Sequence, residues 1–112
     1  MGDSAGGGLA LLTIQALLIQ QIPIPSGIIA LSPCTDLSAS GESYTRNRLI
    51  DVMISSEDND WMVPQILGPN HLKLSADNPI YSPLFGSFKE FPPMYMSCLS
   101  YTLCQSYNFG NI

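Results

Sequence analysis

Apolar residues gather in one long run and two short runs along the chain. The long run, residues 8–21, is rich in alanine, leucine and glutamine and meets no proline before Pro23, so it predicts a helix. Its apolar positions fall on nearly every side of that helix. Because a helix that is apolar all round must be covered on several sides, we expect it to pack within a larger protein.

The two short runs predict strands. Residues 28–32 form a continuous apolar stretch between Gly27 and Pro33, which is typical of a strand buried on both faces of a parallel sheet. Residues 92–98 are predicted as a second buried strand. A helix that leads from an N-terminal turn to a buried strand is part of a βα unit, so the expected fold class is α/β.

The middle of the chain is mostly polar. Residues 35–43 are predicted as a loop and residues 49–54 as a short helix, and a further helix is predicted with Ser56 as its N-cap and its end at Gly68. Residues 71–83 are predicted as another polar loop. The expected architecture is therefore one long helix and two parallel strands, with intervening helices between the strands.

The composition describes a small unit with little charged surface. The chain has 112 residues, of which 46% are hydrophobic and only 12% are charged. A short chain exposes much of its area, so this balance indicates at most one domain and part of a larger protein. The net charge of −5, with only four Lys and Arg residues, excludes a basic surface for nucleic acid or anionic lipid.

The cysteines predict neither a disulfide framework nor a metal site. Cys34, Cys98 and Cys104 are odd in number and lie at no metal-ligand spacing, so a reducing compartment is expected. The most apolar stretch, residues 9–19, is about half of the roughly twenty residues that span a bilayer. Because the N-terminus also has no cationic leader, the chain is expected to be cytoplasmic, with no membrane span.

The chemistry of the chain is concentrated just before the long helix. Residues 2–6, Gly-Asp-Ser-Ala-Gly, fit the Gly-x-Ser-x-Gly nucleophile elbow, in which a serine on a sharp strand-to-helix turn presents its hydroxyl above a parallel sheet. Glycines permit such a turn because they adopt unusual backbone angles at little cost. The first N–H groups of the helix would face an oxyanion formed at Ser4. The strand that should hold the elbow is expected to be missing, because a single residue precedes it.

A glycine-rich turn before a helix has other uses. A phosphate-binding loop would need Gly-Lys-Ser/Thr after the glycines, or Gly-x-Gly-x-x-Gly with an acidic residue about twenty positions on, and the chain has neither. A chymotrypsin-like serine would be followed directly by glycine, whereas Ala5 follows Ser4. Residues 2–6 alone still leave a nucleophilic serine and a plain glycine-rich helix entry as equal alternatives.

Four segments, taken in order, resemble a known family. They are Gly-Asp-Ser-Ala-Gly-Gly at residues 2–7, Leu-Ser-Pro-Cys-Thr-Asp-Leu at residues 31–37 with Ser-Gly-Glu-Ser at residues 40–43, Asp-Asn-Pro-Ile-Tyr-Ser-Pro-Leu at residues 77–84, and Phe-Pro-Pro-Met-Tyr at residues 91–95. Over residues 2–97 the chain resembles part of an α/β-hydrolase of the hormone-sensitive-lipase-like esterase family. The first segment is specific to that branch.

This resemblance implies a fold and an activity. The fold would be an incomplete α/β-hydrolase fold, and the activity would be hydrolysis of a small-molecule carboxylic ester with no metal or organic cofactor. Carried over by position, Ser4 would be the nucleophile and the backbone N–H of Ala5 would be one donor of the oxyanion hole. No other catalytic residue carries over, and the oligomeric state and acyl-chain length stay open.

The chain departs from the family in two places. The upstream His-Gly-Gly-Gly loop, which supplies the other oxyanion donors, is not in the sequence, and residues 97–112 contain no Asp, Glu or His to complete the triad. We therefore divide the chain into a partial hydrolase domain, residues 1–97, and a tail, residues 98–112. The tail is expected to come from a shifted reading frame, a retained intron or a mispredicted gene end.

These departures leave two interpretations of the chain. Because a triad acts as a unit, the chain alone is expected to be nearly inactive, although its parent would be a complete serine esterase. The alternative is a non-catalytic product, such as a module that binds a partner through exposed apolar faces.

The other chemically capable residues are assigned structural roles. His71, the only histidine, precedes the strand that should bear the triad acid, so a solvated loop position is favoured over a catalytic base. Asp36 and Asp77 lie in turn-like sequence and are expected to accept hydrogen bonds from backbone N–H groups. Asp3 is expected to brace the elbow turn, and Cys34 to be a small buried apolar residue. Three residues are assigned to the core rather than to an acyl-chain pocket: Met53, Trp61 and Met62.

Overall fold

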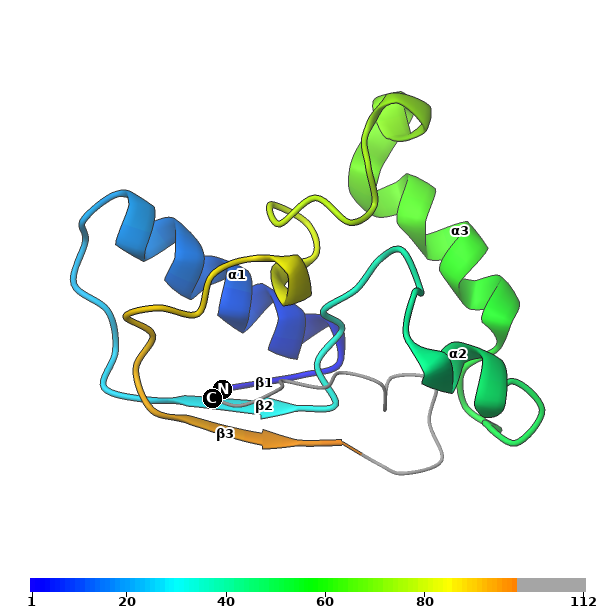
Figure 1. The fold of residues 1–112 in the computed structure, drawn as a ribbon, viewed down its shortest axis with the longest axis horizontal. Helices are drawn as coiled ribbons and strands as arrows, with labels where there is room; N and C mark the ends of the chain where they lie inside the picture. The colour runs from blue at the N-terminus through cyan, green and yellow to red at the C-terminus, as the bar shows by residue number, and fades with distance from the viewer. Residues whose placement is uncertain (99–112) are drawn as a thin grey trace.

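A three-stranded parallel sheet and one long helix form the centre of the molecule (Figure 1). The computed structural model describes residues 1–98, apart from the side chains of Ser56 and Asn59. Of the tail predicted at residues 98–112, only Cys98 falls within this range. The described residues thus include the predicted elbow, both predicted strands and the polar segment between them.

The sheet consists of β1 (Gly2–Asp3), β2 (Ile28–Leu31) and β3 (Met94–Ser97). The strands lie in the order β1-β2-β3 and both pairings are parallel, with Gly2 opposite Ala30. The α/β fold class is therefore confirmed. The prediction of two strands, with none before the elbow, is wrong, because β1 is a third strand. This strand has only two residues and is defined by its pairing with β2, so no apolar run in the sequence indicates it.

The long helix α1 (Ala5–Ile19) covers one face of the sheet. Its Leu11 and Ile14 are buried against β2, and this cluster is the apolar core of the described chain. On the opposite side of α1, Leu9 and Ile19 are exposed. Residues 83–91 also pack on this helix, so the expectation that it is buried on several sides is met in part.

The first turn of α1 was not evident from the sequence. The helix begins at Ala5 rather than at residue 8, because Gly8 N donates a hydrogen bond to Ser4 O (3.1 Å) and closes a turn made largely of glycine. Glycine is a poor helix former, so propensity alone places the start of the helix too late. The helix therefore follows Ser4 directly.

Only one face of the sheet is covered by the described residues. Ile28 and Ala30 of β2 are buried beneath α1, whereas Ile29 and Leu31 on the other side are 43% and 37% exposed. Tyr95 of β3, opposite Ile29 in the register, is 63% exposed. The prediction that β2 is buried on both faces is wrong for this part of the chain, because α1 is the only described helix that packs on the sheet (Figure 1).

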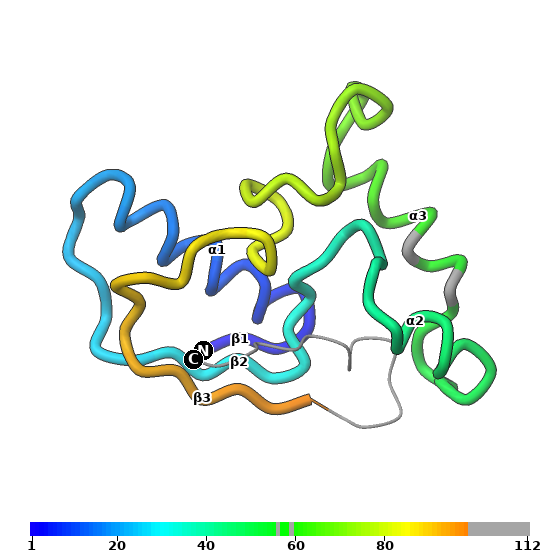
Figure 2. The backbone as a smooth tube through the Cα atoms, viewed as in Figure 1, coloured from blue at the N-terminus to red at the C-terminus, as the bar shows by residue number. Residues whose placement is uncertain are grey.

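Between β2 and β3 the chain makes a helical excursion that starts beyond the carboxyl ends of the strands and returns alongside α1, as the tube in Figure 2 shows. The helix predicted at residues 49–54 is not formed, because the Asp51 carboxylate accepts hydrogen bonds from Met53 N (2.9 Å) and Ile54 N (3.0 Å) and closes a turn instead. The loop predicted at residues 71–83 begins inside a 3₁₀ helix. The elements of the excursion are α2 (Glu42–Arg46), α3 (Ser56–Leu67) and the 3₁₀ helices η1 (Gly68–Lys73) and η2 (Pro83–Phe85).

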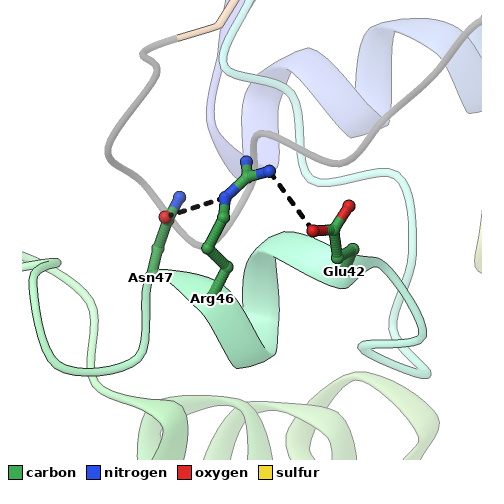
Figure 3. A network of polar contacts seen from close by, with 3 residues as sticks. All are labelled: Glu42, Arg46 and Asn47. Carbon is green, nitrogen blue, oxygen red and sulfur yellow. Dashed lines mark hydrogen bonds and ion pairs between the residues drawn. The ribbon is translucent and has the colours of Figure 1, made fainter.

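The helix α2 is held more by buried than by exposed polar groups. Arg46 contacts Glu42 at 3.5 Å and donates from Nε to Asn47 Oδ1 at 3.4 Å (Figure 3). The Arg46–Glu42 pair is exposed, and exposed ion pairs contribute little to stability. Asn47, by contrast, is buried, and its N–H donates to Ser43 O at 2.8 Å. The end of α2 is therefore anchored at Asn47.

The helix α3 is capped one residue earlier than predicted. Ser55 Oγ accepts a hydrogen bond from Glu57 N (3.0 Å), and Asp58 Oδ2 accepts one from Ser55 N (2.6 Å), which together form a capping box. The helix contains Pro64 and ends before Gly68, as predicted. Ser55 rather than Ser56 is thus the N-cap.

Two of the three residues predicted for the core lie at the surface. Trp61 and Met53 are 71% and 80% exposed, and Met62 is half-buried. Trp61 lies on a side of α3 that no other described element covers, and Met53 lies in the turn before that helix. The core assignment of Trp61 and Met53 is therefore wrong for the described chain.

Candidate functional site

Ser4 lies at the junction of β1 and α1, at the carboxyl end of the sheet. Its backbone has φ 52° and ψ −120°, and its side chain is exposed. A positive φ is uncommon for a residue other than glycine, and strained backbone of this kind is concentrated at functional sites. A strained serine between a strand and a helix is the geometry of a nucleophile elbow, and the carboxyl ends of parallel strands are where α/β proteins bind ligands.

Three backbone hydrogen bonds hold Ser4 in this conformation. Its N–H donates to Leu31 O (2.9 Å), and its carbonyl oxygen accepts from Gly8 N (3.1 Å) and from Cys34 N (2.9 Å). The Ser4 hydroxyl makes no capping hydrogen bond to α1. The backbone of Ser4 is thus fixed by β2, by α1 and by the loop after β2, while the exposed hydroxyl stays accessible from outside.

The glycines around Ser4 are needed to different extents. A Cβ atom on Gly2 would overlap the carbonyl group of Gly6, and one on Gly8 would overlap the carbonyl oxygen of Cys34. A Cβ on Gly7 would lie 2.8 Å from Cβ of Pro33, whereas one on Gly6 would have no atom within 4 Å. Close backbone packing therefore requires Gly2 and Gly8, and Gly6 is the tolerant position of the motif.

We expect Gly6→Ala to stabilise the chain. The new methyl group enters open space in the first turn of α1, and alanine is a better helix former than glycine by about 0.5–1 kcal/mol. The free energy of unfolding, measured by urea denaturation followed by circular dichroism, should rise by roughly that amount. A fall of the same size would show that the turn does not have this geometry in solution.

The backbone N–H of Ala5 lies where an oxyanion donor is expected. Ala5 is the first residue of α1, and the first four N–H groups of a helix have no acceptor within the helix. These groups also carry the positive end of the helix dipole, which favours negative charge beside Ser4. The two residues predicted for catalysis, Ser4 and Ala5, are thus adjacent at an exposed helix start, and their roles stay predictions.

The loop after β2 contains a buried carboxylate that serves the fold. Asp36 is fully buried and accepts hydrogen bonds from Ser38 N (2.8 Å), Ser40 N (2.9 Å) and Ser40 Oγ (2.7 Å), and from Ser38 Oγ. The predicted role of Asp36 in closing a turn is therefore confirmed. The same role is not found for Asp77, whose carboxylate accepts a hydrogen bond from the Ser75 hydroxyl rather than from a backbone N–H. The backbone N–H of Ile80 donates to the neighbouring Asn78 Oδ1 (3.0 Å).

Other residues considered from the sequence do not join Ser4 in the described part of the chain. His71 lies in the 3₁₀ helix η1 rather than in a loop, and there its Nδ1 is 3.2 Å from Gly68 O and its side chain is half-buried. The segment η1 lies at the end of α3 away from the sheet (Figure 1). Asp3 is exposed, and no bracing contact of its carboxylate is seen among residues 1–98.

Cys34 has a backbone role that the sequence did not reveal. Its side chain is only half-buried, but its N–H donates to Ser4 and its carbonyl oxygen lies against Gly8. The third consecutive glycine, beyond the five-residue motif, was the available signal that another backbone segment approaches there.

A separate cavity of about 520 Å³ lies between α1 and residues 79–91. It is lined mainly by apolar side chains, including Leu12, Ile80 and Phe91, and Ser4 is not among its lining residues. Within residues 1–98 no group of three or more His, Cys, Asp and Glu side chains is placed to hold a metal ion. None of the helices in that range has the length and apolar character to cross a membrane.

Comparison with known proteins identifies the family. The model of a family described as alpha/beta hydrolase fold matches residues 1–106. The chain therefore belongs to the α/β-hydrolase fold family. This agrees with the parallel sheet, the helix that follows β1 and the strained serine between them.

Individual relatives are esterases and lipases. The chain is 32% identical over 96 residues to an acetyl-hydrolase of Streptomyces hygroscopicus, and the match covers 83% of this chain and 30% of that protein. It is also 32% identical over 96 residues to a triacylglycerol lipase of Mycobacterium tuberculosis, which covers 86% of this chain and 16% of that protein. The crystal structure of an esterase from the bacterial hormone-sensitive lipase family matches with a TM-score of 0.83 at 31% identity, over 92% of this chain and 33% of that one.

Within its family the chain is thus similar to the hormone-sensitive-lipase-like esterases, as its four sequence segments predict. It spans at most 30% of the length of the two curated relatives, and about a third of that esterase structure.

Proposed function

We propose that the protein to which this chain belongs hydrolyses small-molecule carboxylic esters, with Ser4 as the nucleophile. The observation that carries this proposal is the exposed Ser4, held at φ 52° and ψ −120° between β1 and α1. The names of the relatives, acetyl-hydrolase, triacylglycerol lipase and esterase, support ester hydrolysis. We also propose that residues 1–97 are the hydrolase part of the chain and that the protein is cytoplasmic.

The proposed reaction proceeds in two steps at Ser4. In the first, Ser4 Oγ bonds to the ester carbonyl carbon while a base takes its proton, and the carbonyl oxygen becomes an oxyanion that the N–H of Ala5 stabilises. The C–O bond to the alcohol then breaks, and the alcohol leaves with the proton. In the second step, water attacks the acyl-enzyme and releases the carboxylic acid. No step requires a metal or an organic cofactor.

The general base in this scheme is supplied from beyond the described residues. His71, the only histidine of the chain, contacts Gly68 O in η1 and is not placed at Ser4. Because nucleophile, base and acid act as a unit, we expect this chain alone to turn over esters slowly. The elbow itself should still make Ser4 more reactive than other exposed serines, since the helix start stabilises the negative charge that develops beside it.

Labelling with a fluorophosphonate probe tests this proposal on the 112-residue chain. We expect slow, stoichiometric labelling that is lost in Ser4→Ala. The matched control is Ser26→Ala, which removes another exposed serine hydroxyl far from the elbow in sequence. Its labelling should equal that of the unmodified chain. Absence of labelling in the folded chain, or equal labelling of Ser4→Ala, would contradict the proposal.

A further inference from the structure

A buried hydroxyl joins two loops that are distant in sequence. Ser82 is fully buried, and its Oγ accepts a hydrogen bond from Leu37 N (2.8 Å) and donates one to Ala76 O (2.5 Å). Beside it, Leu84 N donates to Thr35 O (3.1 Å). Residues 35–37, in the loop after β2, are therefore fastened to residues 76–84 by two hydrogen bonds, one to the Ser82 hydroxyl and one from the backbone of Leu84.

The loop that Ser82 fastens is also the loop that contacts the elbow. Cys34, directly before the fastened residues, donates its N–H to Ser4 O at 2.9 Å, and its carbonyl oxygen lies against Gly8 in the first turn of α1. Pro33 packs closely on Gly7. Because the backbone of this loop packs directly on Gly7 and Gly8, a shift of the loop would move Cys34 relative to Ser4.

The hydrogen bond from Cys34 sets the direction of the proposed oxyanion donor. The carbonyl group of Ser4 and the N–H of Ala5 belong to the same planar trans peptide, so they point in opposite directions. Any group that fixes Ser4 O thereby aims the N–H of Ala5. Gly8 N and Cys34 N both donate to Ser4 O, and only Cys34 belongs to a segment outside α1.

We propose that Ser82 is a positioning residue for the Ser4 nucleophile and the Ala5 oxyanion donor. Its hydroxyl holds residues 35–37 so that Cys34 N stays bonded to Ser4 O, which keeps the Ser4–Ala5 peptide in one orientation. The inference rests on the proposed function, because it assigns a catalytic purpose to that orientation. Ser82 lies 78 positions after the nucleophile in the sequence, and it would act through Cys34 without contacting the substrate or the reacting atoms.

A role in stability alone is the competing explanation, and Ser55 provides the control. Ser82 Oγ and Ser55 Oγ each accept one backbone N–H, from Leu37 at 2.8 Å and from Glu57 at 3.0 Å. Ser82→Ala and Ser55→Ala therefore each remove one such hydrogen bond, and Ser82→Ala also removes the one that Ser82 Oγ donates to Ala76 O. Only the first should affect the elbow, because Ser55 caps α3.

The first measurement is amide hydrogen exchange of Cys34 in the 112-residue chain, followed by NMR. In Ser82→Ala the Cys34 amide should exchange at least about tenfold faster, the factor that corresponds to one lost buried hydrogen bond, and in Ser55→Ala its rate should not change. An unchanged Cys34 rate in Ser82→Ala would overturn the proposal. If Ser82→Ala does not fold, the test is made on the unmodified chain. There the exchange rates of the Cys34 and Leu37 amides should correspond to the same free energy of opening. Independent opening of Cys34 would overturn it.

The second measurement is the rate at which the fluorophosphonate labels Ser4. Ser82→Ala should lower that rate by roughly 10- to 100-fold, since small displacements of reacting groups have effects of this size, and Ser55→Ala should leave it unchanged. Equal rates in the two variants would reduce Ser82 to a structural residue. If Ser4 is not labelled in the unmodified chain, the proposed function fails, whereas the exchange measurement still decides whether Ser82 holds the Cys34 contact.

Discussion

Ser4→Ala is expected to lower kcat for ester hydrolysis by at least about 10⁴-fold when the chain is placed in a complete hydrolase. A suitable host is a hybrid in which the matched 96-residue stretch of the Streptomyces hygroscopicus acetyl-hydrolase is replaced by that of this chain. Without Ser4 Oγ no acyl-enzyme can form, and only the oxyanion donors and substrate binding would still accelerate attack by water.

Hydrolysis of p-nitrophenyl acetate by the hybrid measures this effect. Ser26→Ala in the same hybrid is the control and should keep full activity, because Ser26 lies in the exposed turn before β2. Circular dichroism would establish that each variant is folded. If folded Ser4→Ala kept more than about a tenth of the hybrid's kcat, against the loss of four orders of magnitude expected for a nucleophile, Ser4 would not be the nucleophile.

Gly8→Ala is expected to destabilise the 112-residue chain by about 3 kcal/mol or more, at the upper end of the range for overpacking. The added Cβ would overlap the carbonyl oxygen of Cys34, which is a backbone atom and cannot rotate away. The loop after β2 must then move as a whole. The hydrogen bond from Cys34 N to Ser4 O would be lost with it, so the elbow should be distorted as well as destabilised.

Urea denaturation tests this expectation against Gly6→Ala, which makes the same chemical change two residues earlier. The two variants should move in opposite directions, because Gly6 borders open space and Gly8 borders Cys34. In the hybrid, Gly8→Ala should also lose most of its activity while Gly6→Ala keeps it. Equal stabilities of the two alanine variants would mean that the loop after β2 does not pack on α1 as described.

Sequence patterns located the elements that apolar runs define. The strands β2 and β3 and most of α1 lie in largely apolar segments, which predict them within a few residues. The strand β1 was missed because two residues carry no pattern, and the helix expected at residues 49–54 was wrong because the Asp51 side chain closes a turn there. Local side-chain hydrogen bonds and short pairings are therefore where periodicity fails.

For the candidate site, the sequence pointed to Ser4 and Ala5 through a motif whose residues are adjacent. It did not reveal that Cys34 N donates to Ser4 O, or that the buried hydroxyl of Ser82 bonds to the loop that contains Cys34, because those residues come from segments brought together only by folding. The five-residue motif also stops at Gly6, which borders open space, and does not include Gly8, where an added Cβ would overlap Cys34 O. Tertiary contacts of this kind leave at most an unexplained glycine as a signal in a single sequence.

Trapping of the acyl-enzyme tests the identity of the nucleophile most directly. The hybrid would be mixed with p-nitrophenyl acetate, quenched in acid during turnover, and digested for mass spectrometry of its peptides. We expect an acetyl group on the peptide that contains Ser4, and none on that peptide in Ser4→Ala. An acetyl group on another residue, with the Ser4 peptide unmodified, would contradict the central claim that Ser4 is the nucleophile of an ester hydrolase.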